Sequence, residues 1–357
     1  MADTEVYFVT NRAPGPPGAP PARAFGPKMV PLENRALSFG KALVTKVTGD
    51  PATLEQQQVA EVSGVTQDFF SEALQAEIVN SGKNLLVFVH GFANSYSDAM
   101  CRAAFNREWF ANSHMPAADC CVVAFTWPSA GRVVDGEDVL AGAATILLTV
   151  LGLAISHELK SPFTNRYHDD QNNARSSGRD FARTLDRMAP LAAQVRAQGR
   201  KVFLLAHSMG HVVLQGAFAG WANSGQAPSL RFDEAILAAA DADAEFARQP
   251  PVWLTAMPRL TGRTSLYHST EDQILMVSDV VNGKRRLGQS GPPSKADTQT
   301  FPPDNFRFVD CAGVQDPVEE RQLDYTHQYY RRIPEVRDDI AEAFAGAGQP
   351  GQVVLGD

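Results

Sequence analysis

Residues 204–213, LLAHSMGHVV, decide the fold class and raise the main functional question of this chain. The apolar run before Ser208 is typical of a buried strand, and small and apolar residues resume directly after it, as in a buried helix. The segment AHSMG therefore predicts a sharp strand-to-helix turn with a serine at its tip. Such a turn needs small residues two places before and after the serine, here Ala206 and Gly210, so that strand and helix can approach closely. A serine held in this way is a candidate nucleophile, and the alternative is a structural serine.

Apolar strands alternate with amphipathic helices on both sides of this turn. The strand-like segments are continuous apolar runs, and the segments between them have apolar residues at helical spacing. Fully apolar strands that alternate with helices indicate a parallel sheet covered by helices on both faces. The predicted fold class is therefore α/β, with a mostly parallel central sheet. The strands are expected at 84–91, 119–127, 201–208, 233–241 and 264–270, and the clearest helices at 97–113 and 173–199.

The composition is that of an ordinary globular protein, because 44% of the 357 residues are hydrophobic and 20% are charged. The net charge of −8 disfavours a phosphate-binding surface, so nucleic acid is not an expected partner. The four cysteines show no metal-ligand spacing, and we expect neither a metal nor a cofactor. The first ten residues carry acids where a secretory signal would carry basic residues, so a cytoplasmic location is the default expectation.

A nucleophilic serine needs hydrogen-bond donors for the oxyanion that forms during attack. In an open parallel sheet these donors lie on loops at the carboxyl ends of the strands. The segment FVHGF (88–92) ends one predicted strand, which places the backbone N–H of Phe92 at that edge. The N–H of Met209, at the start of the helix after Ser208, is the second candidate donor. The alternative is that FVHGF forms a turn with no catalytic role.

The serine also needs a base and an acid that orients the base. Of the eight histidines, His327 lies in a loop at the correct edge, after the last predicted strand. Asp272 follows another predicted strand, and Ser208, Asp272, His327 is the chain order that a nucleophile turn of this type favours. Asp241 and Asp243, at the end of the preceding strand, are the alternative acids. We favour Asp272 because its loop leads into a helix.

With these residues placed, the sequence resembles the α/β-hydrolase superfamily and, more narrowly, the bacterial family of α/β-hydrolases of unknown function. The likeness covers most of residues 5–345, in order. It implies Ser208 as nucleophile, His327 as base and Asp272 as the acid. Ala206 departs from the first glycine of the usual superfamily pattern. The motifs that carry the likeness are YFVTNRA, LSFGKALV, VFVHGFANSYSDA, FTWPSAG, LLAHSMG, LAAADADAEF, LYHSTEDQIL and DYTHQYYRRIPEV.

The expected domain organisation follows from this resemblance and from composition. The N-terminal part contains a segment, 11–27, that is too rich in proline and glycine for a helix or an inner strand, so we expect an extended lead-in there. A strand-like segment at 36–47 is expected to belong to a small antiparallel edge. The three parts are an N-terminal extension packing on the core (1–50), a single α/β-hydrolase catalytic domain (51–345) with an insert at about 130–172, and a flexible tail (346–357).

The resemblance implies a serine hydrolase that works by two-step acyl transfer. We favour carboxylic esters as the small-molecule substrate, because they are chemically the easiest substrates for these groups. A lipase or an acyltransferase would use every residue named so far. The rival from another class is a non-catalytic binding protein that retains the hydrolase fold, and the intact serine, histidine and acid positions count against it.

Residues 139–156, VLAGAATILLTVLGLAIS, are apolar throughout and reach the lower length limit for spanning a bilayer. Glycines and threonines dilute the stretch and no basic cluster flanks it, so we favour a buried or lid-forming helix over a membrane contact. As a lid, the segment would form an acyl-binding wall over Ser208, and as a core helix it would pack inside the domain. The residues that share one helical stripe and would line the pocket are Leu147, Leu148, Leu151 and Ile155.

Overall fold

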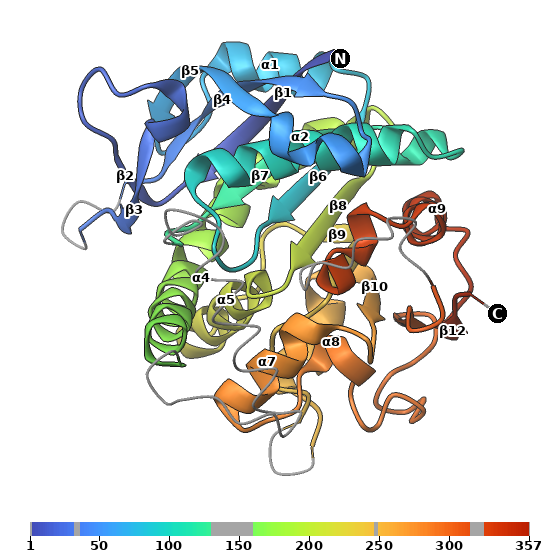
Figure 1. Cartoon of the computed structure of the whole chain (residues 1–357). Coiled ribbons are helices and arrows are strands. Elements are labelled where there is room, and N and C mark those ends of the chain that lie inside the picture. Colours follow the sequence, from blue (N-terminus) through green and yellow to red (C-terminus); the bar gives the residue numbers. More distant parts are fainter. Residues whose placement is uncertain (1, 32–35, 130–159, 246–248, 315–324, 357) are drawn as a thin grey trace.

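A single ten-stranded sheet forms the centre of the molecule (Figure 1). The structure is a computed structural model that describes residues 2–31, 36–129, 160–245, 249–314 and 325–356. The strand order is β12-β11-β10-β9-β8-β6-β7-β1-β4-β5, parallel from β12 to β1 and antiparallel from β1 through β4 to β5. The strands of this sheet are β1 (Ala2–Thr10), β4 (Ser38–Val47), β5 (Gln58–Gln67), β6 (Asn84–Val89), β7 (Cys120–Thr126), β8 (Val202–His207), β9 (Phe232–Ala238), β10 (Thr261–His268), β11 (Phe306–Asp310) and β12 (Gly351–Val354).

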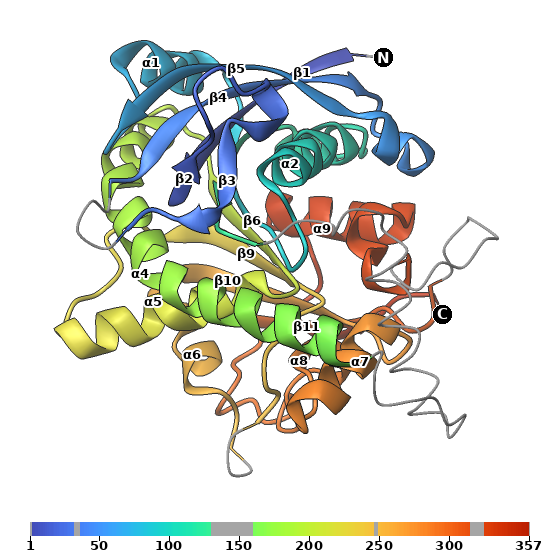
Figure 2. The ribbon, with the colours of Figure 1, turned by 60° about the vertical axis from the view of Figure 1, so that its left-hand side comes forward.

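Helices cover both faces of the sheet, as Figures 1 and 2 show from two directions. Helices α1, α4 and α5 contribute side chains to the hydrophobic core on one face, and α2 and α9 contribute to the core on the other. This is the mostly parallel, doubly covered sheet that the sequence predicts. The α-helices are α1 (Glu72–Asn80), α2 (Tyr96–Ala111), α4 (Lys160–Ala197), α5 (Gly210–Ser224), α6 (Val252–Thr255), α7 (Gln273–Asn282), α8 (Leu287–Ser290) and α9 (Pro334–Ala345). The short 3-10 turns are η1 (Pro21–Arg23), η3 (Pro51–Gln56), η4 (Pro116–Ala118), η6 (Met257–Arg259), η7 (Tyr325–His327) and η8 (Tyr329–Arg331).

The central strands β6, β7 and β8 are almost wholly apolar because both of their faces are buried. In β6, Leu85, Val87 and Val89 point into one core, and Leu86 and Phe88 point into the other. Alternate side chains of a strand point to opposite faces, so a strand covered on both sides needs apolar residues at every position. The continuous apolar runs of the sequence are explained by this double burial.

The N-terminal part of the chain is more deeply integrated than an extension packed on the core. Strand β1 lies inside the sheet, between β7 and β4, and β4 is antiparallel to both β1 and β5. The antiparallel edge expected at 36–47 is present, but the boundary drawn at residue 50 runs through this sheet. Within the proline-rich segment 11–27, two short strands, β2 (Arg12–Pro14) and β3 (Phe25–Met29), pair with each other.

Two further elements differ from the sequence expectations. Helix α4 begins at Lys160, whereas the apolar spacing suggested a start near Asn173. The polar run before Asn173 has no amphipathic pattern to reveal a helix. At the other end, residues 351–354 of the expected flexible tail form β12, which pairs in parallel with β11.

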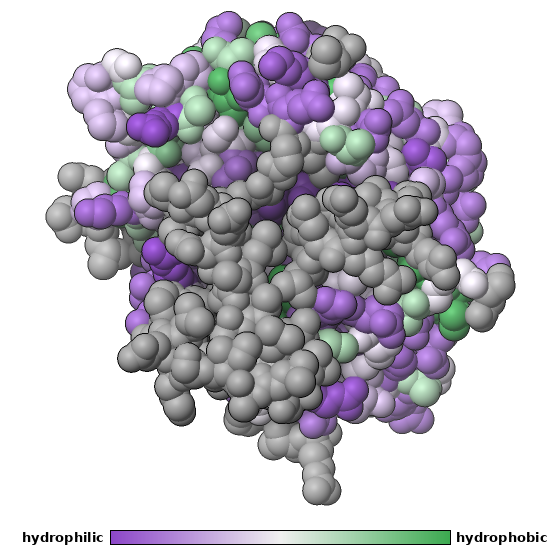
Figure 3. Space-filling model, viewed as in Figure 1, coloured by the Kyte–Doolittle hydropathy of each residue, from purple (hydrophilic) through white to green (hydrophobic). Residues whose placement is uncertain are grey.

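Apolar side chains are sparse on the described surface. Figure 3 shows hydrophilic residues over most of the described part of one face, with scattered apolar ones. Among the described residues, the large apolar side chains that are strongly exposed are Val65, Val252, Val280 and Val354. Such single residues are normal on a globular protein. Most large apolar side chains of the described residues are therefore buried in the two hydrophobic cores.

Candidate active site

Ser208 lies at the tip of the turn between β8 and α5, as the sequence predicts. Its φ angle is +53°, a left-handed conformation that costs a residue with a side chain about 1 kcal/mol or more. The turn is held from behind, because the Ser208 N–H donates to the carbonyl of Ala238 (3.1 Å) and its own carbonyl accepts from the Asp241 N–H (3.2 Å). Ser208 is only 4% exposed. The backbone strain and the main-chain anchors are those of a serine presented on a tight turn.

The small neighbours of Ser208 explain how this turn fits. A Cβ atom on Gly210 would lie 2.7 Å from the carbonyl oxygen of Val89, so only glycine allows α5 to approach the end of β6. Ala206, which replaces the more usual glycine, is fully buried in β8 and pairs with Val89. Its methyl group is part of the apolar core. The alanine is therefore accommodated without opening the turn.

His327 and Asp272 form a buried pair. The Nδ1–H of His327 donates to Asp272 Oδ2 at 2.7 Å, and both side chains are at most 6% exposed. The second carboxylate oxygen of Asp272 accepts from the Leu275 N–H (2.9 Å) and so caps α7. Burial raises the pKa of Asp272, while the charge and hydrogen bond of His327 and the Leu275 N–H act against this rise. The carboxylate thus fixes the ring of His327 with Nδ1 protonated, which leaves Nε2 as the nitrogen able to accept a proton.

His207 connects this pair to the turn of Ser208. Its Nε2–H donates to the carbonyl of His327 at 3.1 Å, and the two rings lie 4.7 Å apart between centroids. Burial lowers the pKa of His207 well below its usual value, and the nearby His327 and Arg331 lower it further. Neutral His207 is therefore a structural support.

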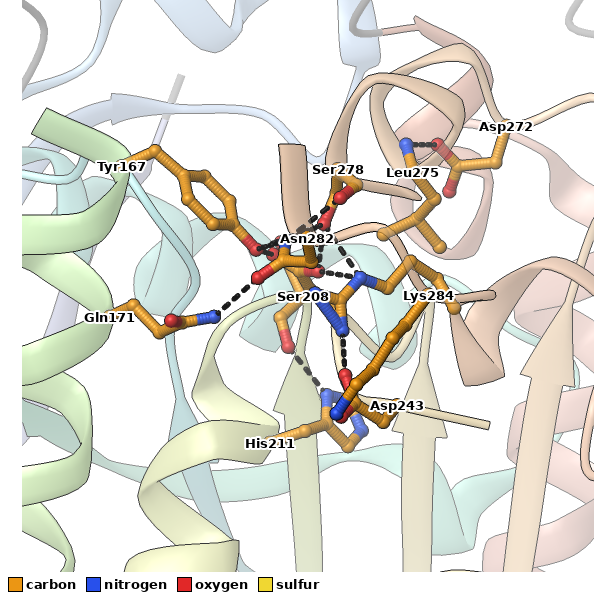
Figure 4. A network of polar contacts seen from close by, with 12 residues as sticks. Tyr167, Gln171, Ser208, His211, Asp243, Asp272, Leu275, Ser278, Asn282 and Lys284 are labelled. Carbon is orange, nitrogen blue, oxygen red and sulfur yellow. Dashed lines mark hydrogen bonds and ion pairs between the residues drawn. The ribbon is translucent and has the colours of Figure 1, made fainter. Parts of the chain in front are cut away.

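The alternative acids occupy a separate polar network, part of which Figure 4 shows. Asp241 is 3% exposed and accepts from the Tyr167 hydroxyl (2.8 Å) and from Ser278, and it pairs with Arg286 (3.3 Å). Asp243 pairs with Arg286 and with Lys284 (2.8 Å). Among the described residues, neither carboxylate hydrogen-bonds to a histidine, whereas Asp272 contacts His327 directly.

His211, in the first turn of α5, supports the turn at Ser208. Its Nδ1–H donates to the carbonyl of Ser208 at 2.7 Å, and burial lowers the pKa of His211 to about 4. It therefore holds the main chain of the turn and does not serve the hydroxyl group. The sequence spacing could have predicted this contact, because a side chain near a helix N-terminus can hydrogen-bond to the carbonyl of the residue three positions earlier.

The loop after β6 lies directly against Ser208. A Cβ atom on Gly91 would lie 2.7 Å from Ser208 Cβ and 3.2 Å from Ser208 Oγ. The next residue along the chain is Phe92, whose ring contacts Tyr167 with 5.7 Å between centroids. Met209, the residue before α5, is fully buried. The two candidate oxyanion donors thus belong to backbone segments that meet at Ser208.

Gly91→Ala should lower kcat by about 10- to 100-fold, because the added methyl group must displace either the serine or the loop by about 1 Å. Steady-state kinetics with a short ester measure this effect. Gly220→Ala in α5 is the matched control, since a Cβ there meets no atom within 4 Å. It should keep kcat and stabilise the helix by up to about 1 kcal/mol. Equal kcat values for the two variants would contradict close packing of this loop on Ser208.

The expected acyl-binding residues Leu147, Leu148, Leu151 and Ile155 lie outside the described residues, as does the whole of 139–156. Within the described ranges, the structure has no helix that is both long and apolar enough to cross a membrane. In the same part of the chain, no three His, Cys, Asp or Glu side chains come together in a way that could hold a metal ion.

One comparison with known proteins identifies the family. Residues 66–343 match the model of the family described as alpha/beta hydrolase of unknown function (DUF900). The chain belongs to this family. The match spans β6 to β11 and includes the candidate residues Ser208, Asp272 and His327. Neither the curated proteins nor the solved structures yielded a match. Membership of this α/β-hydrolase family supports a hydrolase activity.

Proposed function

We propose that this α/β-hydrolase cleaves carboxylic esters through a covalent acyl-enzyme, with Ser208 as nucleophile, His327 as base and Asp272 as the acid that orients the base. The observation that carries the proposal is the buried His327–Asp272 hydrogen bond of 2.7 Å, which His207 connects to a serine held at φ +53°. A serine is a weak nucleophile at neutral pH and needs such a base. Esters are the substrate class because their alcohol leaving group departs readily once it is protonated.

In the first half-reaction, Ser208 Oγ attacks the ester carbonyl carbon as its proton passes to His327 Nε2. The oxyanion of the tetrahedral intermediate accepts hydrogen bonds from the N–H groups of Phe92 and Met209. When the intermediate collapses, the bond to the alcohol oxygen breaks and His327 returns the proton to that oxygen. Asp272 stabilises the imidazolium that exists between these two transfers. The products are a free alcohol and an acyl group on Ser208.

In the second half-reaction, water repeats the sequence on the acyl-enzyme. His327 takes a proton from the water, the hydroxide adds to the acyl carbonyl, and collapse returns the proton to Ser208 Oγ. A carboxylic acid leaves and the serine is restored. An acyltransferase would use an alcohol in place of water at this step, so adding an acceptor alcohol and measuring ester exchange separates the two activities.

A fluorophosphonate probe tests the proposal, because it reacts with an activated serine and leaves a mass tag on that residue. Peptide mass analysis should locate the tag on Ser208 in the full chain, and the same protein should hydrolyse nitrophenyl acetate. Ser208→Ala is the control and should remain unlabelled. Folded wild-type protein that takes no label and hydrolyses no ester would instead support a binding protein that retains the fold.

Residues 139–156 extend this proposal to the acyl group of the substrate. We place the acyl chain against Leu147, Leu148, Leu151 and Ile155 on the basis of their sequence spacing. Leu151→Asp should then raise KM more for longer acyl esters than for acetate, as a chain-length series of nitrophenyl esters would show. Val150→Asp, one position off the stripe, is the control. An equal effect of Leu151→Asp on all chain lengths, or unfolding of that variant, would assign the segment to the core.

A further inference from the structure

The loop that follows β6 is held in one conformation by hydrogen bonds to its carbonyl groups. The Gly91 carbonyl accepts from His90 Nδ1 (2.9 Å) and from Asn94 Nδ2 (2.9 Å). The N–H of Phe92 belongs to the same planar trans peptide, in which the C=O and N–H bonds point in opposite directions. Two donors on the Gly91 carbonyl therefore determine where the Phe92 N–H points. They also polarise this peptide group, which makes the N–H a stronger donor.

Asn94 is the central residue of this arrangement. It is fully buried, and its Nδ2 donates both to Gly91 and to the Phe92 carbonyl (2.7 Å). The intervening residue, Ala93, has a φ angle of +55°, so the loop is strained and needs external support. Its N–H faces a carboxylate oxygen of Asp170 at 3.4 Å. The orientation of the Phe92 peptide thus depends on where Asn94 is held.

Arg12, from the N-terminal β2 strand, holds Asn94. Its guanidinium donates to the Asn94 carbonyl at 2.7 Å. The other nitrogens donate to Thr126 Oγ1 (2.9 Å) and to the carbonyls of Ser129 and Gly26 (3.2 Å each). Arg12 therefore connects the loop after β6 to the end of β7 and to the N-terminal hairpin. Its planar group with fixed donor directions suits this role better than a flexible ammonium group would.

The charge of Arg12 is unusual because the residue is only 1% exposed. Burial lowers the pKa of Arg12 to about 9, and the carboxylates of Asp170 and Asp98 act in the opposite direction. A buried cation costs free energy unless hydrogen bonds and nearby opposite charges compensate for its lost hydration. What distinguishes Arg12 from other buried arginines is its hydrogen bond to the loop that faces Ser208.

We propose that Arg12 is a positioning residue for the oxyanion site, which acts by holding Asn94 and through it the Phe92 amide. This inference rests on the proposed function. It also extends the active site to a part of the chain that precedes residue 66, where the family match begins. Arg12 does not bind the substrate in this proposal. It contributes only to the stability of the tetrahedral intermediate and of the transition states that resemble it, in which an oxyanion forms next to Ser208.

Arg12→Gln is the test variant, and its kcat, its KM and the inhibition constant of an arylboronic acid are to be measured in the full chain. The boronic acid adds to Ser208 and forms a tetrahedral anion that mimics the intermediate. We expect kcat to fall at least about 10-fold, toward the roughly 100-fold cost of losing an oxyanion donor. KM should change by less than about threefold, and the inhibition constant should rise in step with the loss of kcat.

Arg307→Gln is the matched control. Arg307 is equally buried and pairs with Asp339, but it lies in β11 and contacts α9 rather than the loop after β6. This variant should lose thermal stability and keep both kcat and the inhibition constant. Arg12→Lys, which retains the charge and a donor for Asn94, should recover part of the lost activity. A merely structural role of Arg12 would give the two glutamine variants the same kinetics.

Asn94→Ala keeps the test open if Arg12→Gln does not fold. It removes the side-chain donor to the Gly91 and Phe92 carbonyls and leaves the bond from Arg12 to the main chain of residue 94 in place. Folded Arg12→Gln or Asn94→Ala protein with wild-type kcat and boronate affinity would overturn this inference alone. Wild-type protein that neither hydrolyses esters nor binds the boronate would overturn the proposed function as well. The two failures are distinguished by the activity of the wild-type chain.

Discussion

Ser208→Ala should reduce kcat for ester hydrolysis by about 10⁴-fold or more, because the covalent step cannot occur without the hydroxyl group. The oxyanion donors and the substrate site remain, so a slow residual hydrolysis by water is expected. The measurement is kcat with nitrophenyl acetate, together with the melting temperature. Ester turnover by the folded variant within tenfold of wild type would exclude Ser208 as nucleophile.

Substitution of Ser208 also tests the strain of the turn. Alanine keeps a Cβ at the φ of +53°, so the free energy of unfolding should stay close to that of wild type. Ser208→Gly removes the steric penalty and should increase it by about 1 kcal/mol. Both variants should be equally inactive. The comparison thus separates the chemical role of the hydroxyl group from the conformational demand of the turn.

Asp272→Asn should lower kcat by about 10³- to 10⁴-fold, the second largest effect that we expect. An amide at this position can place its NH₂ group toward His327 and favour the tautomer with Nε2 protonated, which cannot accept the serine proton. Asparagine is also a good N-cap, so the hydrogen bond to the Leu275 N–H and the start of α7 should survive. The loss of kcat would therefore not come from unfolding.

Asp243→Asn is the matched control for the choice of acid. This variant loses the ion pairs of Asp243 with Lys284 and Arg286, which do not involve His327. Its kcat should stay within about threefold of wild type, because partly exposed ion pairs contribute little. If Asp243→Asn inactivates the folded enzyme and Asp272→Asn does not, the acid lies after β9 rather than after β10.

The mostly parallel fold was predictable because its inner strands carry a strong local signal. Residues 85–89 and 202–206 are apolar throughout, which follows from burial on both faces. The turn at Ser208 was also predictable, because its small neighbours Ala206 and Gly210 lie only two positions away along the chain. His327 and Asp272 could be proposed from their loops, because the carboxyl ends of parallel strands lie at one edge of a sheet.

The parts that were not predictable depend on partners far away in sequence. Strand β1 is an inner strand of the sheet only because β7, more than a hundred residues later, pairs with it in parallel. Strand β12 was expected to be a flexible tail because a glycine-rich end gives no local signal, and only pairing with β11 orders it. The start of α4 has a polar sequence without helical periodicity, and Asp170 in that stretch contacts the loop after β6.

The amino-acid sequence alone determined the strand-to-helix turn at Ser208, the α/β class and the edge of the sheet where the candidate site lies, because each depends on side chains close together along the chain. The tertiary structure decided which carboxylate faces His327, placing Asp272 there and engaging Asp241 and Asp243 with Arg286. It also brought Arg12 behind the loop that faces Ser208. These choices depend on hydrogen bonds between residues from 43 to 82 positions apart, and such bonds have no signature in local sequence.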